Sequence, residues 1–343
     1  MFNVTYPIIF VSFLISFFSA LILTPFWIKC AKRAGLMGKD MHKINQPKIA
    51  EIGGVIVIIS FIFGILFYLA LDTFHLEFLD FLSKIFRDLE LMAAILTITL
   101  VTIIGLLDDI LGWKIGLKQW QKPFLVIIAA LPMAVVGLGH SAINIPFIGN
   151  INLGIFYSFF IVPIAISGAA NGFNMLAGYN GLEAGMGIII LTAMSYLAWV
   201  TGKSYVSVLG LCFVFSLLGF YVYNKFPSRI FPGDSLTYPL GATIAIMAIL
   251  GHLQTFAIII FIPYFIEFFL KLRGKFKKES FAKIKDDGTL DKPYKKYYGL
   301  EHLAITINKK LFGKAYEKDV VYILYFIQLF IIFIAFIIHG LKI

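Results

Sequence analysis

Two adjacent aspartates, Asp108 and Asp109, follow an apolar run that ends at Leu107. Carboxylates at the C-terminus of an apolar helix are electrostatically unfavourable, so a functional benefit must offset the cost. Adjacent carboxylates commonly hold a hard divalent cation, or one acts as a ligand and the other as a base. The pair therefore indicates a metal-assisted site, with a hydrated helix end as the alternative without chemistry.

Positive charge follows these acids in the same loop, on Lys114, Lys118 and Lys122. Each lysine alone is consistent with an ordinary surface charge. Beside carboxylates that hold a cation, ammonium groups suit a ligand that carries phosphate.

The densest polar segment is 171–185, which contains three asparagines and four glycines within apolar sequence. Asn offers a carbonyl oxygen to a cation and an amide donor to a nucleobase or sugar. Gly lets the backbone approach a phosphate or adopt a positive φ. A turn without a ligand is the alternative, but the density of polar residues favours a binding segment.

Asp234 follows Pro232-Gly233 at a tight turn that opens a further apolar run. Judged alone, it is equally consistent with the N-cap of a helix. Taken together, the acids, amides and lysines predict a site for a metal-bound diphosphate.

These residues lie between long apolar runs in a chain of 343 residues, 60% hydrophobic and 14% charged, with a mean hydropathy of +0.90. This composition excludes an ordinary soluble domain. We predict an all-α integral membrane protein, a single polytopic domain over residues 1–343 with about ten transmembrane helices. The expected spans are 6–28, 52–71, 91–107, 123–140, 153–170, 185–201, 205–223, 236–251, 255–272 and 319–341.

Lysines and arginines concentrate in the loop after the first span and in the 273–318 segment between the last two. With an even number of crossings these loops share one side, which the positive-inside rule assigns to the cytoplasm. The polar segments described above fall on the same side. We therefore expect a multi-pass protein of the cell membrane, with a cytoplasmic-face active site, both termini external and a basic cytoplasmic loop at 273–318.

The net charge of +10 follows from this distribution, so we expect no nucleic-acid partner. Cys30 and Cys212 form no paired motif and indicate no redox function. The histidines show no metal-ligand spacing.

Four stretches, in this order, resemble the polyprenyl-phosphate N-acetylhexosamine-1-phosphate transferases. They are Gly38-Lys39-Asp40 through Pro47 to Glu51, the Asp108-Asp109 pair, the 171–185 segment, and Phe226-Pro227 through Phe231 to Ser235. The 171–185 segment is most similar to the archaeal and eukaryotic UDP-GlcNAc:dolichyl-phosphate branch, because the bacterial branch typically has Asp where this chain has Ala177 and Asn180.

The resemblance implies that a polyprenyl phosphate, with dolichyl phosphate favoured, attacks UDP-GlcNAc to give lipid-diphosphate-GlcNAc and UMP. This would be the first membrane step of glycan assembly, with N-glycosylation favoured. A bacterial-type undecaprenyl-phosphate transferase is the alternative within the class. Outside the class, a transporter of lipid or solute is the alternative, although transporters usually place polar groups near the bilayer midplane. The sequence leaves a homodimer open.

Site residues carry over from the resemblance by position. It implies Mg²⁺ (or Mn²⁺) ligands at Asn174 and Asp234, with a catalytic group formed by Asp108, Asp109 and Lys118. It implies substrate-binding roles for Asn171, Gly178, Asn180, Glu51, Phe231, Lys277 and Lys278. The chain departs from its relatives at 275–279, where lysines stand in place of an Arg/His-rich motif, so its sugar specificity stays open.

Overall fold

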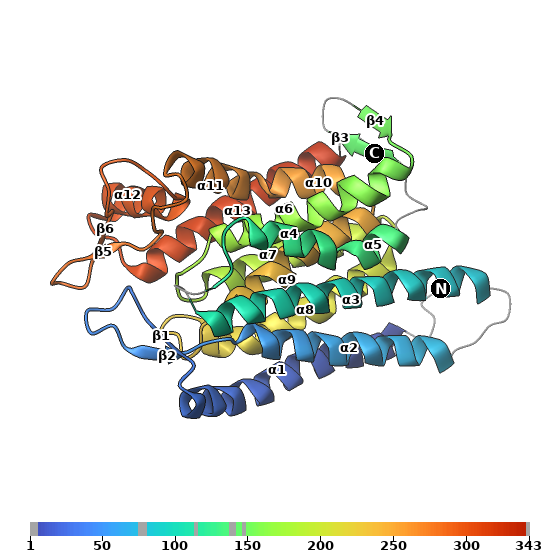
Figure 1. Ribbon diagram of the computed structural model, residues 1–343, viewed down its shortest axis with the longest axis horizontal. Helices are drawn as coiled ribbons and strands as arrows, with labels where there is room; N and C mark the ends of the chain where they lie inside the picture. The colour runs from blue at the N-terminus through green and yellow to red at the C-terminus, as the bar shows by residue number, and fades with distance from the viewer. Residues whose placement is uncertain (1–5, 75–80, 113–115, 137–141, 146–148, 341–343) are drawn as a thin grey trace.

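The computed structural model describes residues 6–74, 81–112, 116–136, 142–145 and 149–340. The chain folds into a bundle of roughly parallel and antiparallel helices (Figure 1). Within the described ranges, three two-stranded antiparallel hairpins lie at the ends of the bundle. The helices are α1 (Tyr6–Ala34), α2 (Gly54–Phe74), α3 (Phe81–Leu111), α4 (Gln121–Ala129), α5 (Leu131–Val136), α6 (Val162–Met175), α7 (Leu182–Val200), α8 (Ser204–Asn224), α9 (Asp234–Leu250), α10 (Gln254–Ile260), α11 (Ile262–Arg273), α12 (Leu300–Phe312) and α13 (Glu317–Gly340).

The hairpins pair short strands that are adjacent in sequence. They are β1 (Met37–Lys39) with β2 (Lys48–Ala50), β3 (Ala142–Ile145) with β4 (Gly149–Asn152), and β5 (Lys283–Ile284) with β6 (Leu290–Asp291). A π-helical turn, Tyr157–Ile161, leads into α6.

The protein is a multi-pass, all-α membrane protein, as the sequence predicts. Within the described residues, seven helices are long and apolar enough to cross a membrane, and the bent α10–α11 pair brings the count to as many as eight. The expected span 236–251 coincides with a shorter helix, and the described part of the span 123–140 holds the short helices α4 and α5, while 137–140 lie outside the described residues; the count of ten is therefore not confirmed.

Two helices continue further than the sequence predicts. α3 runs to Leu111 and α6 to Met175, so the aspartate pair and two of the three asparagines lie on helical turns. Partners within the structure offset the cost of these polar residues: the Asn171 side chain donates to the Ser167 carbonyl one turn earlier in α6, at 2.8 Å.

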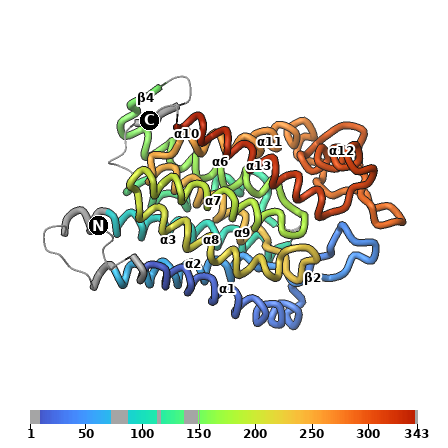
Figure 2. Tube along the Cα trace, turned by 180° about the vertical axis from the view of Figure 1, so that it is seen from behind, coloured from blue at the N-terminus to red at the C-terminus, as the bar shows by residue number. Residues whose placement is uncertain are grey.

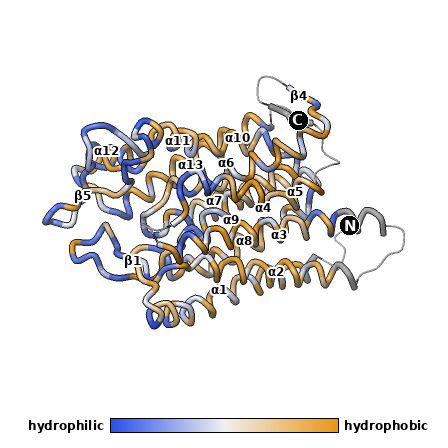
Figure 3. The backbone as a smooth tube through the Cα atoms, viewed as in Figure 1, coloured by the Kyte–Doolittle hydropathy of each residue, from blue (hydrophilic) through white to orange (hydrophobic). Residues whose placement is uncertain are grey.

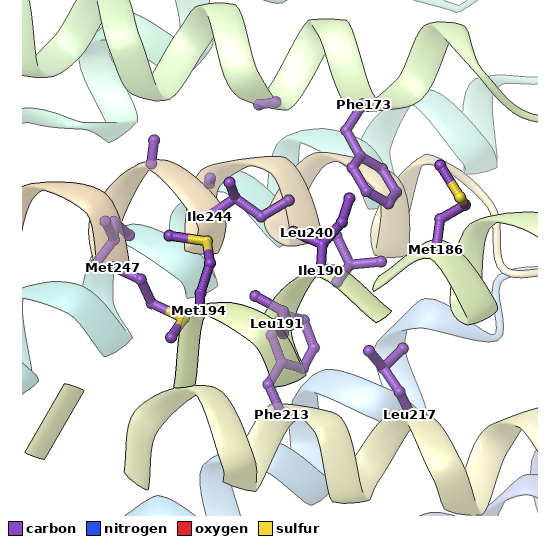
Figure 4. Close-up of a cluster of buried hydrophobic side chains, with 14 of the residues drawn as sticks. Phe173, Met186, Ile190, Leu191, Met194, Phe213, Leu217, Leu240, Ile244 and Met247 are labelled. Carbon is purple, nitrogen blue, oxygen red and sulfur yellow. The ribbon is translucent and has the colours of Figure 1, made fainter. Parts of the chain in front are cut away.

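α9 lies at the centre of the bundle, and its residues from Ser235 to Leu250 are all buried. A helix that is apolar on every side is expected in such a position. Figure 4 shows its Leu240, Ile244 and Met247 among side chains from neighbouring helices. These neighbours are Phe173 of α6, Met186, Ile190, Leu191 and Met194 of α7, and Phe213 and Leu217 of α8. These buried contacts hold α9 in place, and with it the position of Asp234, its first residue.

Polar residues gather at one end of the bundle. Figure 3 shows hydrophilic backbone around β1, β5 and α12, whereas the middles of the helices are hydrophobic. α1 begins and α13 ends at the opposite end (Figures 1 and 2). The polar segments singled out in the sequence thus converge on one end of the molecule.

Candidate active site

A cavity of about 1630 Å³ lies where the polar end of the bundle meets the helices. It is lined by every candidate site residue named from the sequence except Lys118 and Asn180. The candidates that line it are Glu51, Asp108, Asp109, Asn171, Asn174, Gly178, Phe231, Asp234, Lys277 and Lys278. Pockets for one drug-sized molecule span about 300–1,000 Å³, so this space is large enough for two substrates.

Asp109 joins the end of α3 to the start of α9. Its two carboxylate oxygens accept the backbone N–H groups of Asp234, at 2.7 Å, and Ser235, at 3.0 Å. An anion in this position satisfies the free N–H groups of a helix start and is favoured by the helix dipole. The interpretation of Asp234 as its own helix's N-cap is therefore wrong, because Gly233 occupies that position and Asp109 supplies the acceptor.

Gly233 makes this contact sterically possible. Its φ is +74°, and a Cβ there would stand 2.4 Å from Asp109 Oδ2. Only Gly adopts this conformation without strain and leaves room for the carboxylate.

Asp108 and Asp234 share one ammonium group. Lys122 Nζ donates to Asp108 Oδ2 at 2.6 Å and to Asp234 Oδ2 at 3.1 Å. Asp108 also accepts the Leu117 N–H at 2.6 Å. Three carboxylates and one ammonium thus line the same part of the cavity, which leaves an excess of negative charge.

Lys122 was not among the catalytic residues proposed from the sequence; Lys118 was. The structure places the Lys118 side chain at the exposed surface and Lys122 in the carboxylate cluster. One sequence signal points to Lys122: Pro123 marks the first turn of a helix, where a positive charge is unfavourable unless acids offset it.

Asn174 of α6 and Asp234 of α9 both line the cavity. The Asn174 Oδ1 atom accepts a hydrogen bond from Thr237 Oγ1 of α9 at 2.9 Å, which fixes the orientation of the amide. Carboxylate and amide oxygens are the ligands that Mg²⁺ prefers. The donor set and the negative charge of the cluster therefore fit a divalent cation.

Glu51 lines the cavity from the loop that follows β2. Burial, and then the charge of Asp109, raise the pKa of Glu51 above its ordinary value. The same loop is tied to the segment before α9, because Phe231 N–H donates to the Ala50 carbonyl at 2.7 Å and Phe231 O accepts the Gly53 N–H at 3.0 Å. These bonds place Phe231 in the cavity wall.

The turn 176–181 between α6 and α7 forms another wall. Gly178 has a φ of +101°, and its N–H donates to Glu183 Oε1 at 2.7 Å. Asn180, by contrast, is buried behind the wall, where its side-chain amide donates to Asp40 Oδ2 at 3.1 Å. The structure thus brings Gly178, but not Asn180, to the cavity surface.

The segment from Lys275 to Ala282, called the strap below, crosses the polar side of the cavity. Lys277, Lys278 and Phe281 of the strap line it. Gln119 Nε2 donates to the Phe276 carbonyl at 3.2 Å, which ties the strap to the loop before α4.

Apolar residues line the rest of the cavity, on α6, α9 and α10. Two of them, Ile164 and Ile258, are also 56% and 36% exposed on the outside of the bundle. The cavity therefore extends from the carboxylate cluster to the surface that faces lipid.

The fold and this cavity define a class: a polytopic membrane protein that brings acidic, amide and lysine side chains together beside a surface that faces lipid. Known proteins agree with this description. The profile of glycosyl transferase family 4 matches residues 91–252. The chain belongs to glycosyl transferase family 4.

Two archaeal relatives match nearly the whole chain. A protein of Saccharolobus solfataricus, provisionally named UDP-N-acetylglucosamine–dolichyl-phosphate N-acetylglucosaminephosphotransferase, is 39% identical over 317 residues, 91% of each chain. A protein of Sulfolobus acidocaldarius with the same provisional name is 32% identical over 95% of each chain. The enzyme of that name from Dictyostelium discoideum is 28% identical over 72% of this chain and 67% of its own. The predicted resemblance to the archaeal and eukaryotic branch is confirmed.

Proposed function

We propose that this protein transfers GlcNAc-1-phosphate from UDP-GlcNAc to a polyprenyl phosphate of the dolichyl type. A lipid phosphate oxygen attacks the β-phosphorus of the donor, and a new P–O bond forms. The bond between the β-phosphorus and the bridging oxygen breaks, and UMP leaves with that oxygen. The products are lipid-diphosphate-GlcNAc and UMP.

One observation carries this proposal: a single cavity joins a cluster of carboxylates and an ammonium to an apolar face that reaches the lipid side. A polyprenyl phosphate needs both environments, because its head is a dianion near neutral pH and its tail is a hydrocarbon. The names of the relatives supply the substrates, and the continuity of the cavity is consistent with them.

The residues of the chain divide the work. Lys122 lies where its ammonium can pair with a phosphate oxygen, and Asp108 orients Lys122. Asp109 fixes the start of α9 and with it the Asp234 carboxylate. Phosphoryl transfer depends mainly on positioning and on neutralising charge, so the dianionic acceptor needs no strong base. Asp234 and Asn174 would hold Mg²⁺, which when bound would neutralise the diphosphate of the donor.

The proposal includes an orientation. The basic loops and the cavity would face the cytoplasm, where nucleotide sugars are made, and both termini would lie outside. The Lys and Arg residues concentrate in the 29–48 and 273–318 segments, which contain β1, β5 and α12 at the hydrophilic end of the bundle in Figure 3, and this supports the orientation.

Purified protein in detergent tests the proposal. We expect UMP release with UDP-GlcNAc, dolichyl phosphate and Mg²⁺, its abolition by EDTA, and its recovery when Mg²⁺ is restored. UDP-GalNAc, UDP-MurNAc-pentapeptide and undecaprenyl phosphate serve as competing substrates. Folded protein that releases no UMP with any donor and acceptor pair would contradict an enzymatic role.

A further inference from the structure

His42 lies behind the cavity, between two of its walls. Its side chain is buried, and its ring stacks on Tyr179 of the 176–181 turn with 4.0 Å between centroids and 27° between planes. Its Nε2 accepts the backbone N–H of Ala282, the last residue of the strap, at 3.2 Å. One imidazole thus contacts the turn through its face and the strap through its edge.

The two walls also meet directly at this place. Tyr179 OH donates to the Ser280 carbonyl of the strap at 3.4 Å. The Phe281 ring lies 5.6 Å from the His42 ring, and a Cβ on Gly178 would stand 3.1 Å from Phe281. The turn and the strap therefore pack as one unit, with His42 behind the contact.

A second set of bonds surrounds His42. Asp40 Oδ1 accepts the His42 backbone N–H at 3.1 Å, and Asp40 Oδ2 accepts the Asn180 amide at 3.1 Å. Glu317, at the start of α13, accepts the Asn180 backbone N–H on Oε1 at 2.9 Å and Lys43 Nζ on Oε2. The His42 Nδ1 atom lies 3.7 Å from Glu317 Oε1, so the histidine contacts the last helix as well as the loop after α1 and the turn.

Asp40, His42 and Glu317 have the composition of a cation site, and their ligand atoms lie within 4.8 Å of one another. Its position indicates otherwise. None of the three residues lines the cavity, and the Lys43 ammonium lies within ion-pair distance of both carboxylates and offsets their charge. We interpret the group as a structural junction.

We propose that His42 is a positioning residue, which holds the 176–181 turn and the strap together and so determines the affinity for the nucleotide-sugar donor. This inference rests on the proposed function, because the walls it joins carry Gly178, Lys277 and Lys278 on the polar side of the cavity. His42 is separate from the carboxylate cluster and does not line the cavity. Its loss should therefore change donor binding more than the chemical step.

The strap gives this role a physical basis. Lys275 and Phe276 at its start have φ values of 53° and 55°, a conformation that costs non-glycine residues free energy. At the other end of the strap, Lys271 Nζ donates a hydrogen bond to Ser280 Oγ, and the Ala282 N–H donates one to His42 Nε2. Contacts of this kind are needed to keep the strap in its strained path.

Three variants separate the contributions. His42→Phe keeps a ring over Tyr179 and removes the acceptor, His42→Gln keeps an acceptor and removes the ring, and His42→Ala removes both. Ile44→Ala is the matched control, because Ile44 lies two residues away in the same loop and is 62% exposed. Four quantities are measured: the donor KM, kcat, the affinity for UDP, and the rate of tryptic cleavage after Lys277 or Lys278.

Loss of a hydrogen bond or a ring stack each costs about 1 kcal/mol, so we expect the donor KM to rise about fivefold in His42→Phe and His42→Gln. In His42→Ala the rise should be about twentyfold, with kcat within about threefold of wild type. UDP affinity should weaken in parallel, and the strap should be cleaved faster. Ile44→Ala should match wild type in all four quantities.

The proposal is overturned if the donor KM and UDP affinity of the folded His42→Phe variant stay within twofold of wild type. It is equally overturned if all His42 variants lose kcat with an unchanged KM, since that pattern indicates a general structural role. Failure of the proposed function gives a different result: wild type then neither turns over UDP-GlcNAc nor binds UDP. The cleavage of the strap still reports whether His42 holds it in place.

Discussion

Lys122 and Asp108 form the closest charged pair in the cavity, and they illustrate how single residues set the chemistry. The ammonium pairs with two carboxylates at once, from α3 and α9. A phosphate that enters the cavity can replace one of these partners without leaving the lysine unpaired. Under the proposed function, we therefore expect Lys122 to exchange one carboxylate partner for a phosphate of the substrate.

Lys122→Met should reduce kcat/KM about a hundredfold, the scale observed when one charge-stabilising donor is removed from an active site. Lys118→Met is the matched control, since it removes a lysine four positions away that is exposed. Its activity should stay within about threefold of wild type. Steady-state kinetics in detergent measure both, and a larger loss in the Lys118 variant would return the catalytic role to that residue.

Substitutions of the two adjacent aspartates should differ in their effects on stability and activity. Asp109→Asn replaces one of two acceptors for the α9 N–H groups, so it should lower the free energy of unfolding by about 1–2 kcal/mol as well as activity. Asp108→Asn should reduce kcat about a hundredfold or more with a smaller change in stability. Thermal unfolding and UMP release on the same preparations separate the two effects. Equal stability losses would contradict the division of roles.

At the scale of elements, the close crossing of α3 and α9 positions Asp234. A Cβ on Gly105 of α3 would stand 2.4 Å from the Asp234 carbonyl oxygen. The two backbones can approach this closely only because Gly105 has no side chain.

Gly105→Ala should therefore displace the start of α9, lower the unfolding temperature and reduce kcat. Gly168→Ala is the matched control: it lies on α6, and a Cβ there meets nothing within 4 Å. That variant should be neutral or slightly stabilising, because Ala is the better helix former. Thermal unfolding of both variants tests this prediction. An unchanged unfolding temperature in Gly105→Ala would show that the crossing of α3 and α9 can accommodate a methyl group.

α12, within the basic 273–318 segment, should give the protein a measurable sensitivity to acid. Burial, and then the charge of Lys271, lower the pKa of His302 to about 4 from an ordinary 6.5. Between pH 6.5 and about 4 the imidazole of His302 is protonated in the unfolded chain but stays neutral in the folded chain. The free energy of unfolding therefore decreases as the pH falls through this range. His302→Gln should show a smaller fall in unfolding temperature over this range. An identical fall in both proteins would contradict this assignment.

The sequence predicted the fold class and the one-sided distribution of polar loops, and most of the candidate residues it named line the cavity, because these features follow from hydropathy and from unusual residue types. It could not predict which of three lysines meets the carboxylates, since that depends on where α4 begins relative to α3 and α9. It also placed Asn180 in the site, although Asp40, distant in sequence, accepts its amide behind the wall. The ends of α3 and α6 were missed because tertiary partners offset the cost of polar residues on helical turns.

At the scale of the whole molecule, the two ends of the bundle should lie on opposite sides of the membrane. Thr201 is exposed directly after α7, whose other end adjoins the 176–181 turn of the cavity, and Lys283 is exposed at the start of β5. In sealed right-side-out vesicles, an impermeant maleimide should label Thr201→Cys and spare Lys283→Cys. Cys30 is replaced by Ser in both, whereas Cys212 is buried and can remain. The reverse labelling would contradict a cytoplasmic site.

The fate of the β-phosphorus of the donor tests the central claim most directly. Wild type and Asp234→Asn are incubated with UDP-GlcNAc carrying ³²P at the β-position, dolichyl phosphate and Mg²⁺, and the lipid and nucleotide fractions are separated. We expect wild type to transfer the label to the lipid and release unlabelled UMP, and the variant to transfer almost none. Label that stays in the nucleotide fraction as UDP while sugar enters the lipid would show transfer of the sugar alone, and would contradict the account.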